Sequence, residues 1–379
     1  MKIALILMAA LLAGMTPLPA AGLSTWPFWD HYAGHFISPD GRVIDPDRNK
    51  MTTSEGQSYA LFFALVADDR VTFEKLLSWT EDNLAQGDLS KNLPAWSWGQ
   101  TNDGAWNVLD SNSASDSDLW IAYDLAEAGV FWKNPGYSKK GSALFSHIAQ
   151  AEVTDVPQIG PVLVPAPHGF QEGHDEWLLN PSYSPLPLLF AASHFSPQGP
   201  WAKMANALPG WLKLASPSGF AMDWVKCGPK SCSAASAPGD ASAPPRGSYD
   251  AIRVYLWAGM TPTEMPGAAK LLATFAPMLA YTKAHSAPPE SITTNGGVLS
   301  SSAPVSFQAA LIPFAITARE DSVAAQLQQN VRAQFSESTG LLGSPARYYD
   351  QNLALFALGW QEQRFRFAPD GMLRVRWTN

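Results

Sequence analysis

The chain has 379 residues, of which 46% are hydrophobic, and a formal net charge of −8. This composition supplies enough apolar side chains for a large core, and it lacks the basic surface that a general nucleic-acid binder needs. The seven histidines and two cysteines are not spaced as a recognisable metal motif, so we expect no metal ion and no other cofactor.

The N-terminal residues 1–21 have the features of a secretory signal peptide. Lys2 supplies a positive start, residues 3–12 form an apolar run too short to span a bilayer, and Pro17 and Pro19 precede small residues suited to cleavage. A membrane anchor is the alternative, which the short run disfavours. Removal of this segment takes away only Lys2 and changes the net charge from −8 to −9. We therefore expect an exported protein, periplasmic or secreted, with no membrane span after processing.

Helical periodicity dominates the rest of the chain. Apolar residues recur at helical spacing in about eleven segments, joined by loops rich in Pro, Gly, Ser and Asn. The predicted helices are 54–67, 71–83, 115–128, 138–150, 186–195, 200–214, 249–259, 262–284, 304–318, 322–335 and 348–362. Strand signals are few: alternation around Pro369, Asp370 and Gly371 predicts a C-terminal β-hairpin, and residues 36–45 are a second candidate. The pattern indicates an all-α barrel or bundle with short hairpins at its periphery.

One low-complexity segment interrupts this pattern. Residues 233–247 are rich in Ala, Ser, Pro and Gly, which predicts a flexible surface loop in an insertion at about 228–247. A domain linker is the alternative, but the helical pattern resumes in the same style, so we expect residues 22–379 to form one domain. Cys227 and Cys232 lie just before this loop. In an exported protein they are expected to form a small disulfide loop, with two free thiols as the alternative.

The aromatic content is high, with 15 Trp, 10 Tyr and 18 Phe. A single Trp is more often a core residue than a surface one. Several of these, however, stand near Gly, Pro or Asn: Trp26, Trp29, Trp96, Trp98 and Trp106. Flat rings in loops stack on the apolar C–H faces of sugars, so the cluster favours a sugar-binding cleft.

The first of three acidic motifs lies at the start of the helix 54–67. Glu55 stands in its first turn, where Thr53 or Ser54 is positioned to cap the helix. The simplest explanation of Glu55 is that its charge complements the helix dipole. Further evidence is needed to assign it to catalysis.

The other two motifs also begin helices. Asp116 and Asp118 start the helix 115–128, and two carboxylates so close exceed what capping requires. Asp250 starts the helix 249–259, and Arg253 follows one turn later among aromatic and aliphatic residues. The alternative for this pair is a surface ion pair at i,i+3 spacing. The apolar neighbours instead indicate a pair that is at least partly buried.

Three helices that begin with acids would line one cleft if their N-termini converge at one end of a barrel. Glycoside hydrolysis requires two such acidic side chains: one carboxylic acid protonates the leaving oxygen, and one carboxylate activates water or attacks the sugar. Aromatic side chains hold the sugars, and no cofactor takes part.

The motifs resemble those of glycoside hydrolase family 8 over nearly the whole mature chain, from about Trp26 to Trp377. They are "TSEGQSYALFFALVADDR", "WSWG", "NSASDSDLWIAY", "NPSY" and "GSYDAIRVYLWAGM". The resemblance implies an (α/α)6 barrel that cleaves internal β-1,4 bonds of cellulose with inversion. Its strongest likeness is to periplasmic endo-β-1,4-glucanases that accompany bacterial cellulose synthase. It therefore implies a β-1,4-glucan as substrate and a cellulose synthesis and export complex as a candidate partner.

The resemblance also implies roles for individual residues. Glu55 matches the general acid, Asp250 the general base that activates water, and Asp116 the acid that positions the sugar. The substrate-binding residues implied are Tyr249 and Arg253 beside the base, and the cleft aromatics Trp96, Tyr183, Tyr348 and Tyr349. A helix N-terminus favours an anion, whereas a general acid must keep its proton. Burial or a neighbouring carboxylate such as Asp116 must therefore raise the pKa of Glu55.

Two alternatives remain at this point. A protein that has kept the fold but lost catalysis would bind glycans without cutting them, although Glu55 and Asp250 are both present. Alternatively, the enzyme cleaves another β-1,4 glycan, xylan or chitosan. The negative charge would suit cationic chitosan, but the charge of a whole surface is a weak guide to substrate.

Overall fold

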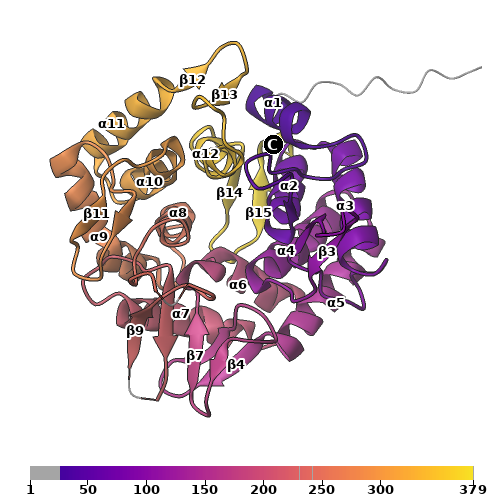
Figure 1. The fold of residues 1–379 in the computed structure, drawn as a ribbon, viewed down its shortest axis with the longest axis horizontal. Coiled ribbons are helices and arrows are strands. Elements are labelled where there is room, and N and C mark those ends of the chain that lie inside the picture. Colours follow the sequence, from indigo (N-terminus) through magenta and orange to yellow (C-terminus); the bar gives the residue numbers. More distant parts are fainter. Residues whose placement is uncertain (1–25, 230, 241, 379) are drawn as a thin grey trace, which may run out of the picture.

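The computed structural model describes residues 26–229, 231–240 and 242–378, so the expected signal peptide lies outside the described residues. Within this part of the chain there are twelve α-helices, arranged as two concentric rings (Figure 1). None of the described helices combines the length and the apolar composition that crossing a bilayer would need.

The even-numbered helices form the inner ring and the odd-numbered helices the outer ring. The inner helices are α2 (Ser54–Val66), α4 (Ser115–Phe131), α6 (Leu186–Phe195), α8 (Ala251–Met260), α10 (Val305–Thr317) and α12 (Tyr348–Gln361). The outer helices are α1 (Pro27–Phe36), α3 (Arg70–Leu84), α5 (Pro135–Ala151), α7 (Trp201–Ala215), α9 (Ala268–His285) and α11 (Asp321–Arg332). Each inner helix contacts one outer helix beside it: α2 with α3, α4 with α5, α6 with α7, α8 with α9, α10 with α11, and α12 with α1. This alternation is the (α/α)6 barrel that the sequence predicted.

The sequences of the helices explain their places. In α2 every residue except Glu55 is buried, so this helix has no face for water. In α11, by contrast, the buried residues form a single stripe: Val323, Ala324, Leu327 and Val331. A helix that is apolar all round requires a central position, whereas an amphipathic helix covers a core with one face.

The centre of the barrel is aromatic. Phe356 of α12 lies 4.7 Å from Phe63 and 5.3 Å from Phe62 of α2, measured between ring centroids. Trp120 of α4 lies 5.0 Å from Phe62, and Trp257 of α8 lies 5.2 Å from Phe356. These edge-to-face and stacked rings join helices distant in sequence, so they hold the inner helices against one another.

Short antiparallel sheets and two 3-10 helices occupy the connections. The strands are β1 (Thr52–Thr53), β2 (Ser97–Gln100) and β3 (Trp106–Asp110) in one sheet; β4 (Val153–Val156) with β5 (Gly160–Leu163); β6 (Gln171–Glu172), β7 (Glu176–Leu179), β8 (Trp224–Cys227) and β9 (Cys232–Ala235) in a four-stranded sheet; β10 (Ser291–Ile292) with β11 (Val298–Ser300); β12 (Phe335–Ser336) with β13 (Leu341–Leu342); and β14 (Phe365–Phe367) with β15 (Leu373–Val375). The 3-10 helices are η1 (Pro181–Tyr183) and η2 (Arg376–Thr378). The predicted C-terminal hairpin is β14 and β15, and it is confirmed.

Several expectations for individual elements were wrong. Helix α1 was not predicted, because Trp26 and Trp29 were taken for loop aromatics, whereas both are buried. The second candidate hairpin, at residues 36–45, is partly confirmed: Ile37 and Val43 form an antiparallel bridge, although no regular strands are present. Helix α9 begins at Ala268 instead of residue 262, because the preceding residues form turns.

The low-complexity segment also differs from its prediction. Its first three residues pair with β8 as part of β9 instead of forming a loop. Cys227 and Cys232 stand directly opposite each other in this strand pair and form a disulfide, which confirms the expected bridge.

Candidate active site

The starts of three inner helices bring the predicted acids to one mouth of the barrel. Glu55 lies in the first turn of α2, Asp116 in the first turn of α4, and Asp250 immediately before α8. Tyr349 lies in the first turn of α12. The Oγ1 atom of Thr53 accepts the Gly56 N–H at 3.1 Å and caps α2. The carboxylate of Glu55 is therefore not the capping group of its helix.

The guanidinium of Arg253 joins all three predicted acids. Its Nη1 lies 2.8 Å from Glu55 Oε2, and its Nη2 lies 3.0 Å from Asp250 Oδ1 and 3.6 Å from Asp116 Oδ2. The Arg253 side chain is only 4% exposed, and its Nη2 also donates to Ser182 Oγ at 3.0 Å. The sequence predicted the buried Asp250–Arg253 pair but not that the same arginine binds Glu55.

Three carboxylates around one guanidinium cannot all be neutralised by it, so one of them is favoured to keep a proton. Burial raises the pKa of Glu55 to about 7; Arg253 opposes this shift, while Asp116 and Asp250 add to it. Burial also raises the pKa of Asp116, against the effect of Arg253 and of the Ser117 N–H. Glu55 thus has the property of a general acid, despite its place at a helix N-terminus.

The predicted aromatic residues divide between the mouth and the core. The Tyr349 hydroxyl donates to the Tyr249 carbonyl at 2.5 Å and accepts from Arg253 Nη1 at 3.5 Å. Tyr249 is 41% exposed, and the Tyr183 ring lies 5.9 Å from the guanidinium carbon of Arg253. Tyr348 is buried against Phe36, whereas the Tyr349 hydroxyl contacts Arg253 directly.

Trp96 connects the site to the sheet beside it. Its carbonyl accepts the Ser54 N–H at 3.0 Å, and its own N–H donates to the Asn112 carbonyl at 2.8 Å. Its side chain is partly exposed. These backbone bonds tie the start of β2 to the residue before Glu55, so Trp96 helps to fix the position of the candidate acid.

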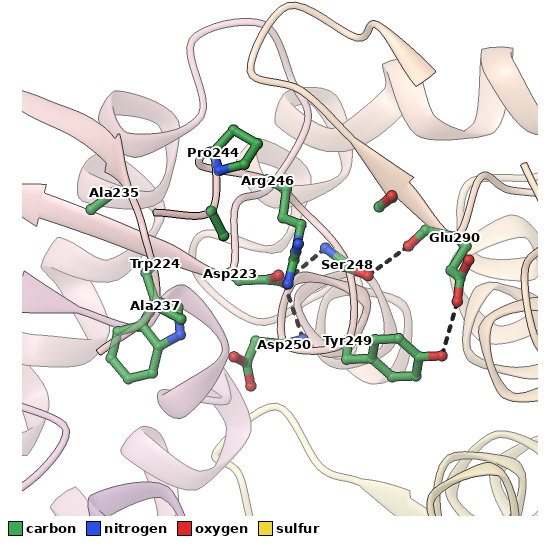
Figure 2. Close-up of a pocket in the computed structure, with 12 residues that line it drawn as sticks. Asp223, Trp224, Ala235, Ala237, Pro244, Arg246, Ser248, Tyr249, Asp250 and Glu290 are labelled. Carbon is green, nitrogen blue, oxygen red and sulfur yellow. Dashed lines mark hydrogen bonds between the residues drawn. The ribbon is translucent and has the colours of Figure 1, made fainter. Parts of the chain in front are cut away.

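Sequence reasoning missed Asp223, which lies just before β8. Its Oδ1 accepts three backbone N–H groups, those of Ser248, Asp250 and Ala251, at 2.7, 3.1 and 2.8 Å. Figure 2 shows the bonds to Ser248 and Asp250. Burial and the nearby Asp250 raise the pKa of Asp223 to about 6, while these three N–H groups lower it. Asp223 therefore caps α8 from another segment and holds the backbone of the candidate base. No local sequence signal indicates this, because the contact spans 27 residues.

Asp223 and Asp250 line a pocket of about 410 Å³. In Figure 2 the side chains of Asp250 and Tyr249 point in opposite directions, and the Tyr249 hydroxyl donates to Glu290 at 3.1 Å. The pocket wall also contains residues of the low-complexity segment: Ala235, Ala237, Ala243, Pro244 and Arg246. This segment thus lies beside the candidate base.

A second acidic pair lies behind the site. Asp118 and Glu152 are both fully buried, and Ser113 Oγ donates to Glu152 Oε1 at 2.5 Å. Burial raises the pKa of Glu152 to about 8, and burial together with Glu152 raises the pKa of Asp118. Asp118 therefore serves neither as a helix cap nor as a ligand of Arg253. In the described part of the chain, no group of three or more His, Cys, Asp or Glu side chains is placed to hold a metal ion.

A helical barrel with three acids and several aromatic rings at one mouth is the architecture of a glycoside hydrolase. The profile of the family described as glycosyl hydrolases family 8 matches residues 3–363. This chain belongs to glycosyl hydrolase family 8.

Similar proteins cover nearly the same length. A protein of Salmonella typhi named endoglucanase is 44% identical over 365 residues, which span 96% of this chain and 94% of that protein. An endoglucanase of Xanthomonas axonopodis pv. citri (strain 306) is 43% identical over 98% of this chain and 96% of its own. The crystal structure of an endo-1,4-D-glucanase from Vibrio fischeri ES114 matches with a TM-score of 0.85 and 39% identity, covering 93% of this chain and 100% of that chain.

Proposed function

We propose that this protein is an exported endo-β-1,4-glucanase that hydrolyses internal bonds of cellulose with inversion. The observation that carries the proposal is the placement of Glu55 and Asp250 on one buried guanidinium, with the pKa of Glu55 raised to about 7. The names of the similar proteins support the substrate class.

In this mechanism Glu55 donates its proton to the glycosidic oxygen. Asp250 accepts a proton from a water molecule that attacks the anomeric carbon from the opposite face. Asp116 holds the sugar at the point of cleavage, and Tyr183 and Tyr249 offer ring faces to neighbouring sugars. Arg253 binds both carboxylates, so acid and base act from a fixed geometry.

Inversion requires room for water between the base and the sugar. We expect the carboxyl groups of Glu55 and Asp250 to be about 6.5–9.5 Å apart when substrate is bound, and not at the about 5–5.5 Å of a retaining enzyme.

Proton NMR during the first minutes of cello-oligosaccharide hydrolysis tests the mechanism. An inverting enzyme releases the α-anomer from a β-linked substrate before mutarotation mixes the two forms. Initial release of the β-anomer would instead reveal a covalent intermediate, and Asp250 would then not act through water.

A comparison of substrates tests the specificity. Carboxymethyl-cellulose should be cleaved faster than xylan or chitosan at equal mass concentration. Faster cleavage of xylan or of chitosan would instead identify that glycan as the substrate. Binding of all three without any cleavage would support the non-catalytic alternative.

We also propose that the protein acts in the periplasm, linked to cellulose synthesis, as the likeness noted from the sequence implies. N-terminal sequencing of the protein from a periplasmic extract should show removal of about 21 residues. Affinity purification from cells that make cellulose should recover a cellulose synthesis or export complex with it. An unprocessed protein would contradict export to the periplasm. Recovery of the protein without such a complex would contradict the link to cellulose synthesis.

A further inference from the structure

A second pocket lies at the end of the barrel opposite the acidic mouth. Its volume is about 610 Å³, within the range of about 300–1,000 Å³ that small-molecule sites occupy. It lies among the C-terminal ends of α8, α10 and α12 and the hairpin of β14 and β15, which Figure 1 shows beside α12. The catalytic acids stand at the N-terminal ends of inner helices, so this pocket is separate from the proposed active site.

The charge of this pocket is opposite to that of the whole protein. Three arginines line it, Arg319, Arg366 and Arg374, against one acid, Glu264. The whole chain, by comparison, has a net charge of −8. Among the described residues, none of these three arginines forms an ion pair with a carboxylate. The pocket therefore concentrates positive charge that the protein does not neutralise.

Two of the arginines face each other directly. Arg366 of β14 and Arg374 of β15 are cross-strand partners. The hairpin cannot turn them away, because its alternate residues are buried in the core: Phe365, Phe367, Leu373 and Val375. Like charges directly opposite on a strand pair destabilise it. An anion between them would remove this repulsion.

The surroundings of Arg366 support the same conclusion. Its guanidinium carbon lies 4.0 Å from the centroid of the Trp360 ring, and its Nη1 donates to the Phe365 carbonyl at 3.0 Å. Burial lowers the pKa of Arg366 to about 10. Arginines near helix C-termini also offset the helix dipole. An interaction with the helix dipole, however, does not explain why two arginines face each other across the hairpin.

We propose that this pocket binds a small anion that carries phosphate or carboxylate groups. The planar fork of each arginine binds either group through two parallel hydrogen bonds, and the Trp360 ring holds one fork in place. The site lies outside the catalytic machinery and does not depend on the substrate proposed above.

Isothermal titration calorimetry at low salt tests the proposal with two probes, pyrophosphate and citrate, which separate a phosphate ligand from a carboxylate ligand. Arg366→Gln and Arg374→Gln should each weaken binding of the preferred probe at least about tenfold. Arg332→Gln removes the same charge from an exposed position on α11 outside this pocket, and it should bind like the unaltered protein. Absence of binding for both probes would overturn the proposal, and so would equal weakening in all three variants.

The unfolding temperature supplies an independent readout. Without an anion at low ionic strength, Arg374→Gln should unfold at the same or a higher temperature than the unaltered protein, because it relieves the repulsion from Arg366. A saturating probe should raise the unfolding temperature of the unaltered protein but not that of the variant. A lower unfolding temperature for Arg374→Gln without an anion would show that this arginine supports the hairpin, and would contradict the proposal.

Discussion

Arg253 organises the acidic cluster at the barrel mouth. It is nearly fully buried and contacts three carboxylates that come from helices far apart in sequence. A buried charge of this kind is tolerated only when it is paired. Here the same pairing also gives the acids different surroundings, which suits them to different roles. Burial raises the pKa of one of these acids, Glu55, to about 7, so it retains its proton over a wider pH range than an exposed Glu does.

The raised pKa of Glu55 predicts the alkaline limit of activity. A general acid acts only while it is protonated, and burial raises the pKa of Glu55 to about 7. The active form should therefore dominate below about pH 7 and be lost as the pH rises through that value. Above it, kcat/KM for a soluble cello-oligosaccharide should fall about tenfold for each pH unit. A profile that stays level to pH 9 would exclude Glu55 as the acid.

Replacement of the candidate acid and base provides a direct test. Glu55→Gln keeps the shape of the side chain but removes the proton donor, and Asp250→Asn removes the proton acceptor. Each should lower turnover at least about a hundredfold, the lower end for acid–base catalysis. Circular dichroism should show unchanged helix content, because both residues lie at helix ends. Loss of helix together with activity would instead assign these acids a structural role.

Asp223 is expected to act through Asp250 without contacting the substrate. Asp223→Ala would leave three N–H groups before and in α8 without their acceptor, including that of Asp250. A small displacement of the base suffices to lower kcat, so we expect a loss of about tenfold or more with little change in KM. Asp223→Asn keeps an oxygen for these groups and should restore most of kcat. If both variants lose activity equally, the oxygen contacts are not the cause.

At the level of elements, the inner helices were the most predictable parts of the chain. Helix α6 has the predicted bounds and α2 differs by one residue, because their apolar sequences leave few other conformations. The connections were less predictable. The hairpin of β2 and β3 has no strict alternation, and its position depends on backbone bonds from Trp96 to Ser54 and Asn112. The acids could be found from their local motifs, whereas Asp223 and the shared role of Arg253 depend on tertiary contacts.

Helix α4 carries a buried acid that makes stability depend on pH. Glu127 Oε1 accepts the Leu373 N–H at 2.8 Å, which joins α4 to β15. Burial raises the pKa of Glu127 to about 8, whereas an unfolded Glu titrates near about 4.3. Between these values the folded state binds the proton more tightly, so the contribution of Glu127 to stability is fully present below about pH 4.3 and is lost as the pH rises toward 8.

Glu127→Gln tests this dependence. The variant keeps an oxygen for the Leu373 N–H but has no proton to lose. Its free energy of unfolding should fall less between pH 5 and pH 8, with a difference in slope of at most about 1.4 kcal/mol per pH unit. Urea denaturation at several pH values measures the free energy of unfolding of the variant and of the unaltered protein. Equal slopes would mean that Glu127 stays charged in the folded state.

At the level of the whole molecule, the two ends of the barrel have opposite electrostatic character. The mouth gathers acids around one arginine, and the far end gathers arginines around one acid. Because surface charges act over only about 8–10 Å at physiological salt, the two ends present separate surfaces to charged partners.

An endo-acting enzyme cleaves a polymer at internal bonds, so each cleavage shortens the polymer strongly and lowers the viscosity of its solution. The viscosity of a carboxymethyl-cellulose solution should fall steeply while few reducing ends have appeared. An enzyme that removes sugars from chain ends would release reducing sugar at nearly constant viscosity. The ratio of the two signals over the first per cent of hydrolysis therefore decides between internal and terminal cleavage.

The pairing of α12 with α1 means that the ring closes at a seam between the two ends of the chain. Residues near the C-terminus also join the first two inner helices: the Tyr123 hydroxyl of α4 donates to the Gly371 carbonyl at 3.1 Å, and Trp377 Nε1 donates to the Leu65 carbonyl of α2 at 3.3 Å. Without α12 the ring would stay open, and the aromatic side chains that pack against Phe356 of this helix, Phe62, Phe63 and Trp257, would lose their cover from water.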